Sequence, residues 1–227
     1  MVQFHVVKCC FSTANIAKVS IFVKQKRDMI KNLIFDFGKV LLDYDYDQFL
    51  KTFIDTQEAR DKFREVVSTP EFVLMCDRGD VSFEELIKMT QARHPEWHRE
   101  LQIFYDRQMN AMTIEMPGMR DLLKRLRKRG YKLYGLTNWS LFVYQVIEKY
   151  DILQMLDGRV ISAEEHLIKP DKAIYDCICQ RFGLHAEECV FTDDRAINVE
   201  GARAAGMKAI VFKDAAQFET ELEEYLK

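Results

Sequence analysis

Six polar residues stand where apolar, strand-like runs of this sequence end or where the next helix begins. They are Asp36, Thr137, Asn138, Lys169, Asp193 and Asp194. In an open parallel sheet, ligands bind beyond the carboxyl ends of the strands. We therefore expect these side chains to meet at one edge of a sheet.

The types of these side chains suit phosphoryl transfer. Three crowded carboxylates repel one another until a cation binds, and oxygen ligands without His or Cys favour a hard ion such as Mg²⁺. Lys169 and Thr137, with backbone N–H groups, are suited to hold the oxygens of a phosphoryl group. One carboxylate can then attack phosphorus and form an acyl phosphate. The residues predict a magnesium site and catalysis through aspartate.

Short β-rich runs alternate with amphipathic helical stretches from Met29 onward, which is typical of a parallel sheet built from β-α units. The runs are apolar on both sides, so we expect helices on both faces of the sheet. The predicted strands cover residues 33–37, 132–137, 158–162, 189–193 and 208–212. The predicted helices cover residues 119–129, 141–150, 169–182 with Pro170 in the first turn, and 198–205. This pattern predicts an α/β fold with a three-layer, Rossmann-like core.

The stretch 45–110 interrupts this alternation directly after the first strand. It is charged and rich in aromatic residues, and its apolar positions recur near the helical period, as at Phe63, Val66 and Val67. A segment of this length without strands is too long for a linker. We interpret it as an inserted α-helical cap subdomain, with the α/β core formed by residues 29–44 and 111–227.

The composition excludes several classes of function. The 227 residues include 33 Lys and Arg and 36 Asp and Glu, a formal charge of -3 that does not indicate a nucleic-acid partner. No run reaches the roughly 18 apolar residues of a membrane span. Six cysteines without a C-x-x-C pair argue against zinc and against a disulfide framework. We expect a cytoplasmic protein that binds a small molecule, in an oligomeric state that the sequence leaves open.

Residues 1–28 differ from the rest of the chain in charge. They hold five Lys or Arg and one acidic residue, and Lys8 and Lys18 interrupt the apolar core that an export signal would need. We expect either a flexible extension or an initiation codon placed too early, because Met29 stands directly before the first convincing strand.

Taken in order along the chain, these motifs resemble those of the haloacid dehalogenase superfamily, in the subgroup with a helical cap after the first strand and similar to bacterial sugar-1-phosphate phosphatases. The resemblance covers residues 29–227. The segments that carry it are 33–40 (LIFDFGKV), 136–138 (LTN), 169–170 (KP) and 191–198 (FTDDRAIN).

The resemblance implies a role for the residues of the first three motifs. Asp36 is implied as the nucleophile and a metal ligand, and the carbonyl of Gly38 as a second metal ligand. Thr137 and Asn138 are implied to bind the phosphoryl oxygens. Lys169 is implied to neutralise the phosphate and the nucleophile.

The fourth motif supplies the remaining metal ligands. Asp193 and Asp194 are implied to hold Mg²⁺, with Asp193 ranked first, and Asn198 to order their loop. The implied activity is that of a Mg²⁺-dependent phosphatase, which hydrolyses a small phosphorylated metabolite through an aspartyl-phosphate.

One residue departs from the pattern of the family. Its phosphatases usually carry a second Asp two residues after the nucleophile as general acid and base, and that position is Gly38 here. General acid–base help contributes roughly 10²–10⁴-fold, so we expect a slow enzyme, a good leaving group or a substitute acid. Asp43 and Asp45 follow closely, although solvated positions at the entry to the cap suit them better. Similar phosphatases that act on sugar 1-phosphates also carry Gly here, which makes a hexose 1-phosphate a candidate substrate.

Three other functions are compatible with parts of this pattern. A 2-haloacid dehalogenase uses the same nucleophile but does not require the acidic pair Asp193 and Asp194. A receiver domain carries its acidic pair first along the chain and lacks a cap. A non-catalytic regulatory protein that binds metal and phosphate is the main alternative to the enzyme.

Overall fold

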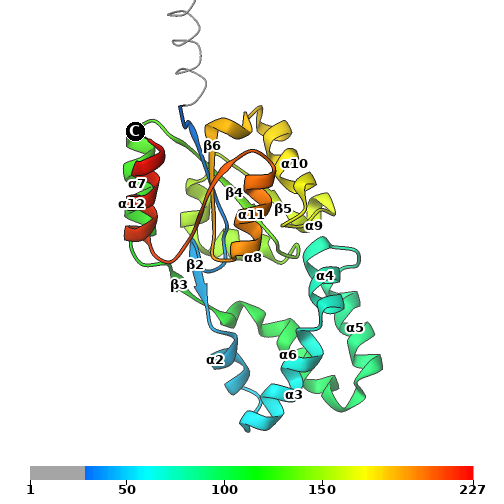
Figure 1. Ribbon diagram of the computed structural model, residues 1–227. Helices are drawn as coiled ribbons and strands as arrows, with labels where there is room; N and C mark the ends of the chain where they lie inside the picture. Colours follow the sequence, from blue (N-terminus) through cyan, green and yellow to red (C-terminus); the bar gives the residue numbers. More distant parts are fainter. Residues whose placement is uncertain (1–28, 227) are drawn as a thin grey trace, which may run out of the picture.

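The computed structural model describes residues 29–226 (Figure 1). The expectation for residues 1–28 lies outside the described residues. No described helix is long and apolar enough to cross a membrane.

A five-stranded parallel sheet forms the centre of the core, as predicted. Its strands are β1 (Asn32–Phe35), β4 (Lys132–Thr137), β5 (Gly158–Ile161), β6 (Cys189–Asp193) and β7 (Lys208–Val211), in the order β5-β4-β1-β6-β7. Strand β1 is central and pairs in parallel with β4 and β6, with Phe35 opposite Gly135 and Thr192. All four residues of β1 are buried. The parallel pairing brings the carboxyl ends of these strands to one edge.

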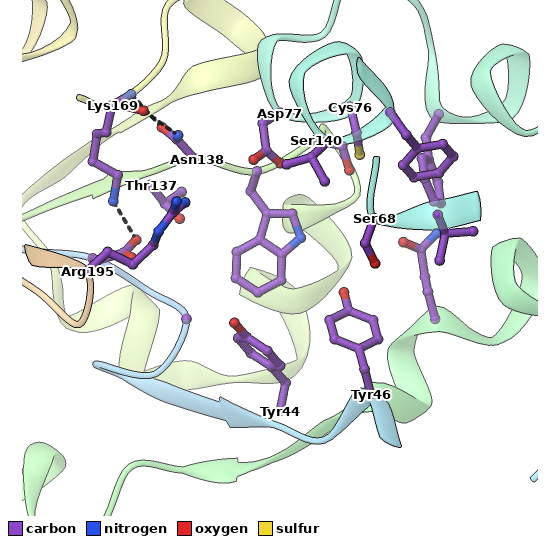
Figure 2. A pocket seen from close by; sticks show the side chains of 18 of the residues that line it. Tyr44, Tyr46, Ser68, Cys76, Asp77, Thr137, Asn138, Ser140, Lys169 and Arg195 are labelled. Atoms are coloured by element: carbon purple, nitrogen blue, oxygen red, sulfur yellow. Dashed lines mark hydrogen bonds and ion pairs between the residues drawn. The ribbon is translucent and has the colours of Figure 1, made fainter. Parts of the chain in front are cut away.

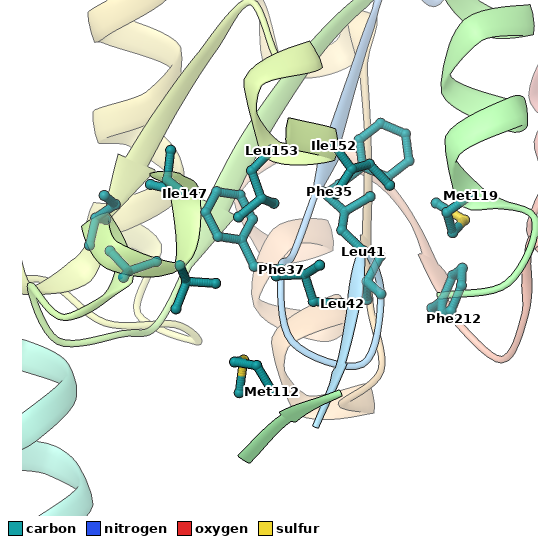
Figure 3. Close-up of a cluster of buried hydrophobic side chains, with 14 of the residues drawn as sticks. Phe35, Phe37, Leu41, Leu42, Met112, Met119, Ile147, Ile152, Leu153 and Phe212 are labelled. Atoms are coloured by element: carbon teal, nitrogen blue, oxygen red, sulfur yellow. The ribbon is translucent and has the colours of Figure 1, made fainter. Parts of the chain in front are cut away.

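Helices cover both faces of the sheet, because successive side chains of a strand point to opposite faces. Leu33 and Phe35 belong to one buried cluster and Ile34 to another. The first cluster includes residues of α7 (Met119–Lys128), α8 (Val143–Lys149) and α12 (Ala215–Tyr225). The second includes residues of α10 (Lys172–Phe182) and α11 (Ala196–Ala204). Figure 3 shows part of the first cluster, where Phe35 and Phe37 lie among aliphatic side chains. The three-layer α/β core is confirmed.

Helix α10 begins later than the sequence predicted. Its N-cap is Asp171 and its first residue is Lys172, so Pro170 precedes the helix instead of standing in its first turn. The bond between Lys169 and Pro170 is cis. Lys169 therefore belongs to the loop before the helix.

The helices that follow the first strand form a separate layer beyond the carboxyl edge of the sheet (Figure 1). They are α2 (Tyr46–Lys51), α3 (Gln57–Val67), α4 (Pro70–Arg78), α5 (Phe83–Arg93) and α6 (His98–Arg107), with short 3-10 turns at Pro95–Trp97 and Gln108–Ala111. We call residues 45–111 the cap. The side chains of Asp45, Thr56, Thr69 and Ser82 each accept an N–H group at the start of a helix.

Two short strands join the cap to the core. Strand β2 (Leu42–Tyr44) pairs antiparallel with β3 (Met112–Glu115), which the sequence did not predict. The N–H group of Asp45 donates to the carbonyl of Ala111 at 2.8 Å, so the two ends of the cap lie side by side. The helix α9 (Ser162–Glu165) follows β5 and packs against the end of α4.

Candidate active site

Asp36 directly follows the central strand. Its N–H group donates to the carbonyl of Thr192 at 3.0 Å and so extends the pairing of β1 with β6. Its Oδ1 atom accepts the N–H of Phe37 at 2.7 Å and forms an ion pair with Lys169 Nζ at 3.0 Å. Burial raises the pKa of Asp36 to about 7, although the Lys169 ammonium opposes this shift. Among the described residues, no hydrogen bond is made to its second oxygen, Oδ2.

Lys169 connects two carboxylates in the interior of the site. Its fully buried ammonium lies 2.6 Å from Asp193 Oδ2 and 3.0 Å from Asp36 Oδ1, and it also donates to the carbonyl of Leu136. Burial disfavours the charge, but the two carboxylates outweigh it and raise the pKa of Lys169. The amide of Asn138 fixes the backbone of Lys169 with two hydrogen bonds, of 2.8 and 3.0 Å (Figure 2). The lysine is therefore charged and positioned.

Asp193 ends β6 and is completely buried. Oδ1 accepts the N–H of Arg195 at 2.9 Å, and Asn198 donates to both carboxylate oxygens at 3.0 Å. With Lys169, these donors occupy both oxygens. Asn198 thus ties helix α11 to the end of the strand.

Three carboxylates meet at this edge of the sheet. Asp36, Asp193 and Asp194 each place an oxygen within 4.8 Å of the other two. Burial and the neighbouring Asp193 raise the pKa of Asp194, which is otherwise exposed to the cavity. Three carboxylates against the one ammonium of Lys169 leave an excess of negative charge, and the donors are all oxygen. This set of residues fits a hard divalent cation such as Mg²⁺.

The site opens into a cavity of about 390 Å³ between the core and the cap. The predicted residues that line it are Asp36, Gly38, Thr137, Asn138, Lys169 and Asp194. Asp193 lies behind them and does not line the cavity. The side chain of Asn138 binds the backbone of Lys169 through both its oxygen and its nitrogen. Its backbone N–H and the second hydrogen of its amide nitrogen are left for a phosphoryl oxygen.

A tyrosine fills the space beside Gly38. A Cβ atom at Gly38 would lie 2.9 Å from Cε1 of Tyr44. Burial, with Asp194 and Asp36 nearby, raises the pKa of Tyr44 to about 12. Its ring contacts the ring of Tyr46 edge to face at 5.3 Å, and the Lys39 ammonium lies 4.6 Å from its centroid.

The two acids downstream of Gly38 have partners outside the cavity. Asp43 pairs with Lys39 at 2.5 Å. Asp45 is the N-cap of α2 and accepts the N–H of Gln48 at 2.8 Å. Neither side chain lines the cavity.

The cap contributes a wall of the cavity, whose residues could not be picked out from the sequence. Its apolar and aromatic part includes Tyr46, Leu50, Phe72, Phe83 and Phe104, and its polar part includes Arg64, Ser68, Asp77 and Gln108. On the core side, Trp139 and Arg195 also line the cavity. Because these two residues directly follow motif residues, their sequence position was a usable signal. Asp77 gave none, since it is one of many charged residues in a helical stretch.

An α/β core with a helical cap over a site of carboxylates and one lysine defines a class of capped hydrolase folds. Residues 30–206 match the family model of the haloacid dehalogenase-like hydrolases. The chain belongs to this family.

Curated relatives and solved structures agree with this assignment. The chain is 36% identical to a phosphatase of Mycobacterium tuberculosis over 113 residues, which are 47% of this chain and 50% of the relative. It is 30% identical to a glyceraldehyde 3-phosphate phosphatase of Pyrococcus abyssi over 122 residues, 53% of this chain and 51% of the relative. The chain therefore spans about half the length of these relatives.

The fold is also found in solved structures of low sequence identity. A HAD family enzyme of Bacteroides thetaiotaomicron, solved with magnesium and inorganic phosphate, is 22% identical with a TM-score of 0.65, covering 82% of this chain and 95% of that one. A HAD-like family hydrolase of Porphyromonas gingivalis is 19% identical with a TM-score of 0.69, covering 88% and 98%. At these identities the likeness concerns the fold.

Proposed function

We propose that this chain is a Mg²⁺-dependent phosphatase that hydrolyses a small phosphate monoester through an aspartyl-phosphate on Asp36. One observation carries the proposal. The Lys169 ammonium and a backbone N–H group hold Oδ1 of Asp36, while Oδ2 stays without a hydrogen bond from the described residues beside the cavity. This arrangement orients one oxygen of a carboxylate for attack and leaves it reactive.

The chain's own residues supply the nucleophile and hold the phosphoryl group in both chemical steps. Oδ2 of Asp36 attacks phosphorus, and the bond from phosphorus to the leaving oxygen breaks. Thr137 and the N–H of Asn138 then hold the phosphoryl oxygens. The three N–H groups of the Lys169 ammonium are already given to Leu136, Asp36 and Asp193, so its positive charge stabilises the negative charge of the phosphoryl group from behind. A water molecule hydrolyses the acyl phosphate, which releases inorganic phosphate and restores the carboxylate of Asp36.

The carboxylates of the site also provide ligands for Mg²⁺. We propose that Asp36, Asp194 and the carbonyl of Gly38 hold Mg²⁺, with Asp193 as a further ligand if it exchanges one of its present donors. When bound, Mg²⁺ would neutralise and orient the phosphate group. The Mg²⁺ held by the Bacteroides enzyme of the same fold supports this assignment.

The cavity limits the substrate to a small ester. Its volume of about 390 Å³ is at the lower end of ligand pockets. The cap wall combines aromatic side chains with Arg64, Ser68 and Gln108. A hexose 1-phosphate is one candidate, because sugars use both aromatic faces and hydrogen-bonding groups. Named relatives act on other small monoesters, such as glyceraldehyde 3-phosphate.

We place the activity in the cytoplasm, in keeping with the free thiols of the four described cysteines.

The test is phosphate release from a panel of small esters, including hexose 1-phosphates, with Mg²⁺ or with EDTA. We compare the wild type with Asp36→Asn and with Asp121→Asn, a control at an exposed position of α7. The proposal predicts metal-dependent turnover that Asp36→Asn abolishes and Asp121→Asn leaves unchanged. Binding of Mg²⁺ and phosphate without turnover would favour the regulatory protein, and metal-independent halide release from 2-haloacids would favour the dehalogenase.

A further inference from the structure

The proposed reaction needs a proton donor that the core does not supply. An alkoxide is a poor leaving group, so the leaving oxygen must receive a proton as its bond to phosphorus breaks. Gly38 has no side chain to give one. Among the described residues, the carboxylates that line the cavity are Asp36, Asp77 and Asp194. The proposed function uses Asp36 as the nucleophile and Asp194 for the metal, which leaves Asp77.

We propose that Asp77, on the cap helix α4, is the general acid and base of this enzyme. The inference rests on the proposed function and adds a catalytic residue to it. Asp77 replaces the missing core carboxylate from the opposite wall of the cavity.

Contacts with the core fix the position of Asp77. Ser162, which is fully buried, donates from its hydroxyl to the carbonyl of Asp77. The same hydroxyl accepts the N–H of Trp139 at 2.9 Å, in the loop that continues from Asn138. One side chain thus connects the backbone of Asp77 to the loop that carries the proposed phosphate ligands.

The residues after Asp77 add to this anchor. The ring of His166 contacts the carbonyl of Arg78 at 3.1 Å. A Cβ atom at Gly79 would lie 2.6 Å from the carbonyl oxygen of Ala163, so α4 ends in close contact with α9. The end of α4 is therefore held against the core at three consecutive residues.

The carboxylate of Asp77 is available for proton transfer. It makes no hydrogen bond or ion pair with another residue among 29–226, and Figure 2 shows it beside Ser140 in the wall of the cavity. The charges that act on it from the core are those of Lys169 and Arg195.

The remaining ionisable groups near this end of α4 are accounted for. Arg78 pairs with Asp80 at the surface, and His166 contacts the backbone of α4. Cys76 and Tyr46 line the same cavity, and the charge of Asp77 helps to raise the pKa of both. Burial raises the pKa of Asp77 to about 6, with Lys169 and Arg195 opposing the shift. A pKa near neutrality suits a group that donates a proton in one step and accepts one in the next.

The proton that Asp77 gives up in the first step is recovered in the second. As Asp36 attacks phosphorus, the protonated Asp77 gives its proton to the leaving oxygen, and the free alcohol departs. In the second step the Asp77 carboxylate takes a proton from the attacking water. The bond between phosphorus and Asp36 then breaks, and Asp77 is protonated again for the next cycle.

The test is the dependence of the rate on the leaving group. p-Nitrophenolate is a good leaving group that needs no proton, whereas the alkoxide of an alkyl phosphate must be protonated in order to leave. In Asp77→Asn, we expect phosphorylation of the enzyme by alkyl phosphates to fall by about 10²–10⁴-fold, while the initial burst of p-nitrophenol stays within about tenfold of the wild type. The phosphorylated enzyme should then accumulate, because the base for the second step is also missing.

Two control variants isolate the role of Asp77 as a proton donor. Asp80→Asn changes an acid at the same end of α4 that pairs with Arg78 outside the cavity, and should leave both substrates unaffected. Tyr44→Phe removes the hydroxyl beside Gly38. Three results would overturn the assignment of Asp77. The first is that Asp77→Asn slows phosphorylation by both substrates equally, and the second is that it slows neither. The third is that the dependence on the leaving group appears in Tyr44→Phe instead. A wild type that is inactive on every ester overturns the proposed function itself, and that result is distinct from the others.

Discussion

Adding a single methyl group at Gly38 should destabilise the protein through one contact. The backbone of Gly38 is not in the left-handed region, so alanine fits its conformation. The new Cβ atom would lie 2.9 Å from Cε1 of Tyr44, well inside the contact distance of about 3.5–4.0 Å between carbon atoms. The ring of Tyr44 must then shift, which disturbs its contacts with Tyr46 and with the Lys39 ammonium.

The size of the effect follows from two opposing terms. Overpacking of this kind costs about 1–3 kcal/mol. Replacing glycine by alanine also restricts the unfolded chain, which stabilises the protein by about 0.4–1 kcal/mol. We expect Gly38→Ala to lower the free energy of unfolding by about 1–2 kcal/mol. In a Tyr44→Ala background the first term disappears, and the same change should be neutral or slightly stabilising.

The assay is urea unfolding of the wild type, the two single variants and the double variant. The coupling free energy between positions 38 and 44 should be about 1–3 kcal/mol, as is typical of residues in contact. If Gly38→Ala costs the same in both backgrounds, within about 0.5 kcal/mol, the ring of Tyr44 does not occupy this space. The same contact predicts that Gly38→Asp alone does not restore a catalytic carboxylate, because its side chain meets the tyrosine.

Two further predictions concern the buried charges. Lys169→Met leaves Asp36 and Asp193 without their shared ammonium, so the free energy of unfolding in EDTA at neutral pH should fall by about 3–5 kcal/mol and recover in part with Mg²⁺; an unchanged urea midpoint would contradict this. For Asp36, the pKa of about 7 lies above the ordinary value of 3.8, so the folded state binds the proton more tightly than the unfolded state does. This contribution to stability is present below about pH 4 and is lost as the pH rises to about 7. Asp36→Asn should therefore melt at a higher temperature than the wild type at pH 8 in EDTA, with a gain on the order of a few kcal/mol that disappears near pH 4; a gain independent of pH would refute it.

The core could be predicted from the sequence because its signals are local. Each strand is an apolar run of the right length, and helices such as α7 end near a glycine. The proposed site residues follow from the parallel sheet, since Asp36 and Asp193 come at the carboxyl ends of adjacent strands β1 and β6. Residue type and position at a strand end were enough to place them together.

What the sequence missed depends on contacts between distant segments. Strands β2 (LDY) and β3 (MTIE) are short and are not apolar runs like the strands of the core, and they pair with each other although the whole cap lies between them in sequence. Tyr44 enters the site because it packs against Gly38, and Asp77 because Ser162 holds the end of α4. No pattern around either residue distinguishes it from its neighbours. Pro170 was misplaced because a proline just before a helix and one in its first turn look the same in sequence.

The pairing of β2 with β3 has a consequence for the entropy of the chain. An insertion normally costs the loop-closure entropy of bringing its two ends together, and this cost rises only slowly with length. Here the ladder and the bond from Asp45 to Ala111 hold those ends side by side, at 2.8 Å between nitrogen and oxygen. Because the junction is closed by its own hydrogen bonds, caps of different length and sequence can be attached to the same core. Segment 46–110 can therefore vary without moving the ends of the core strands that carry Asp36 and Asp193.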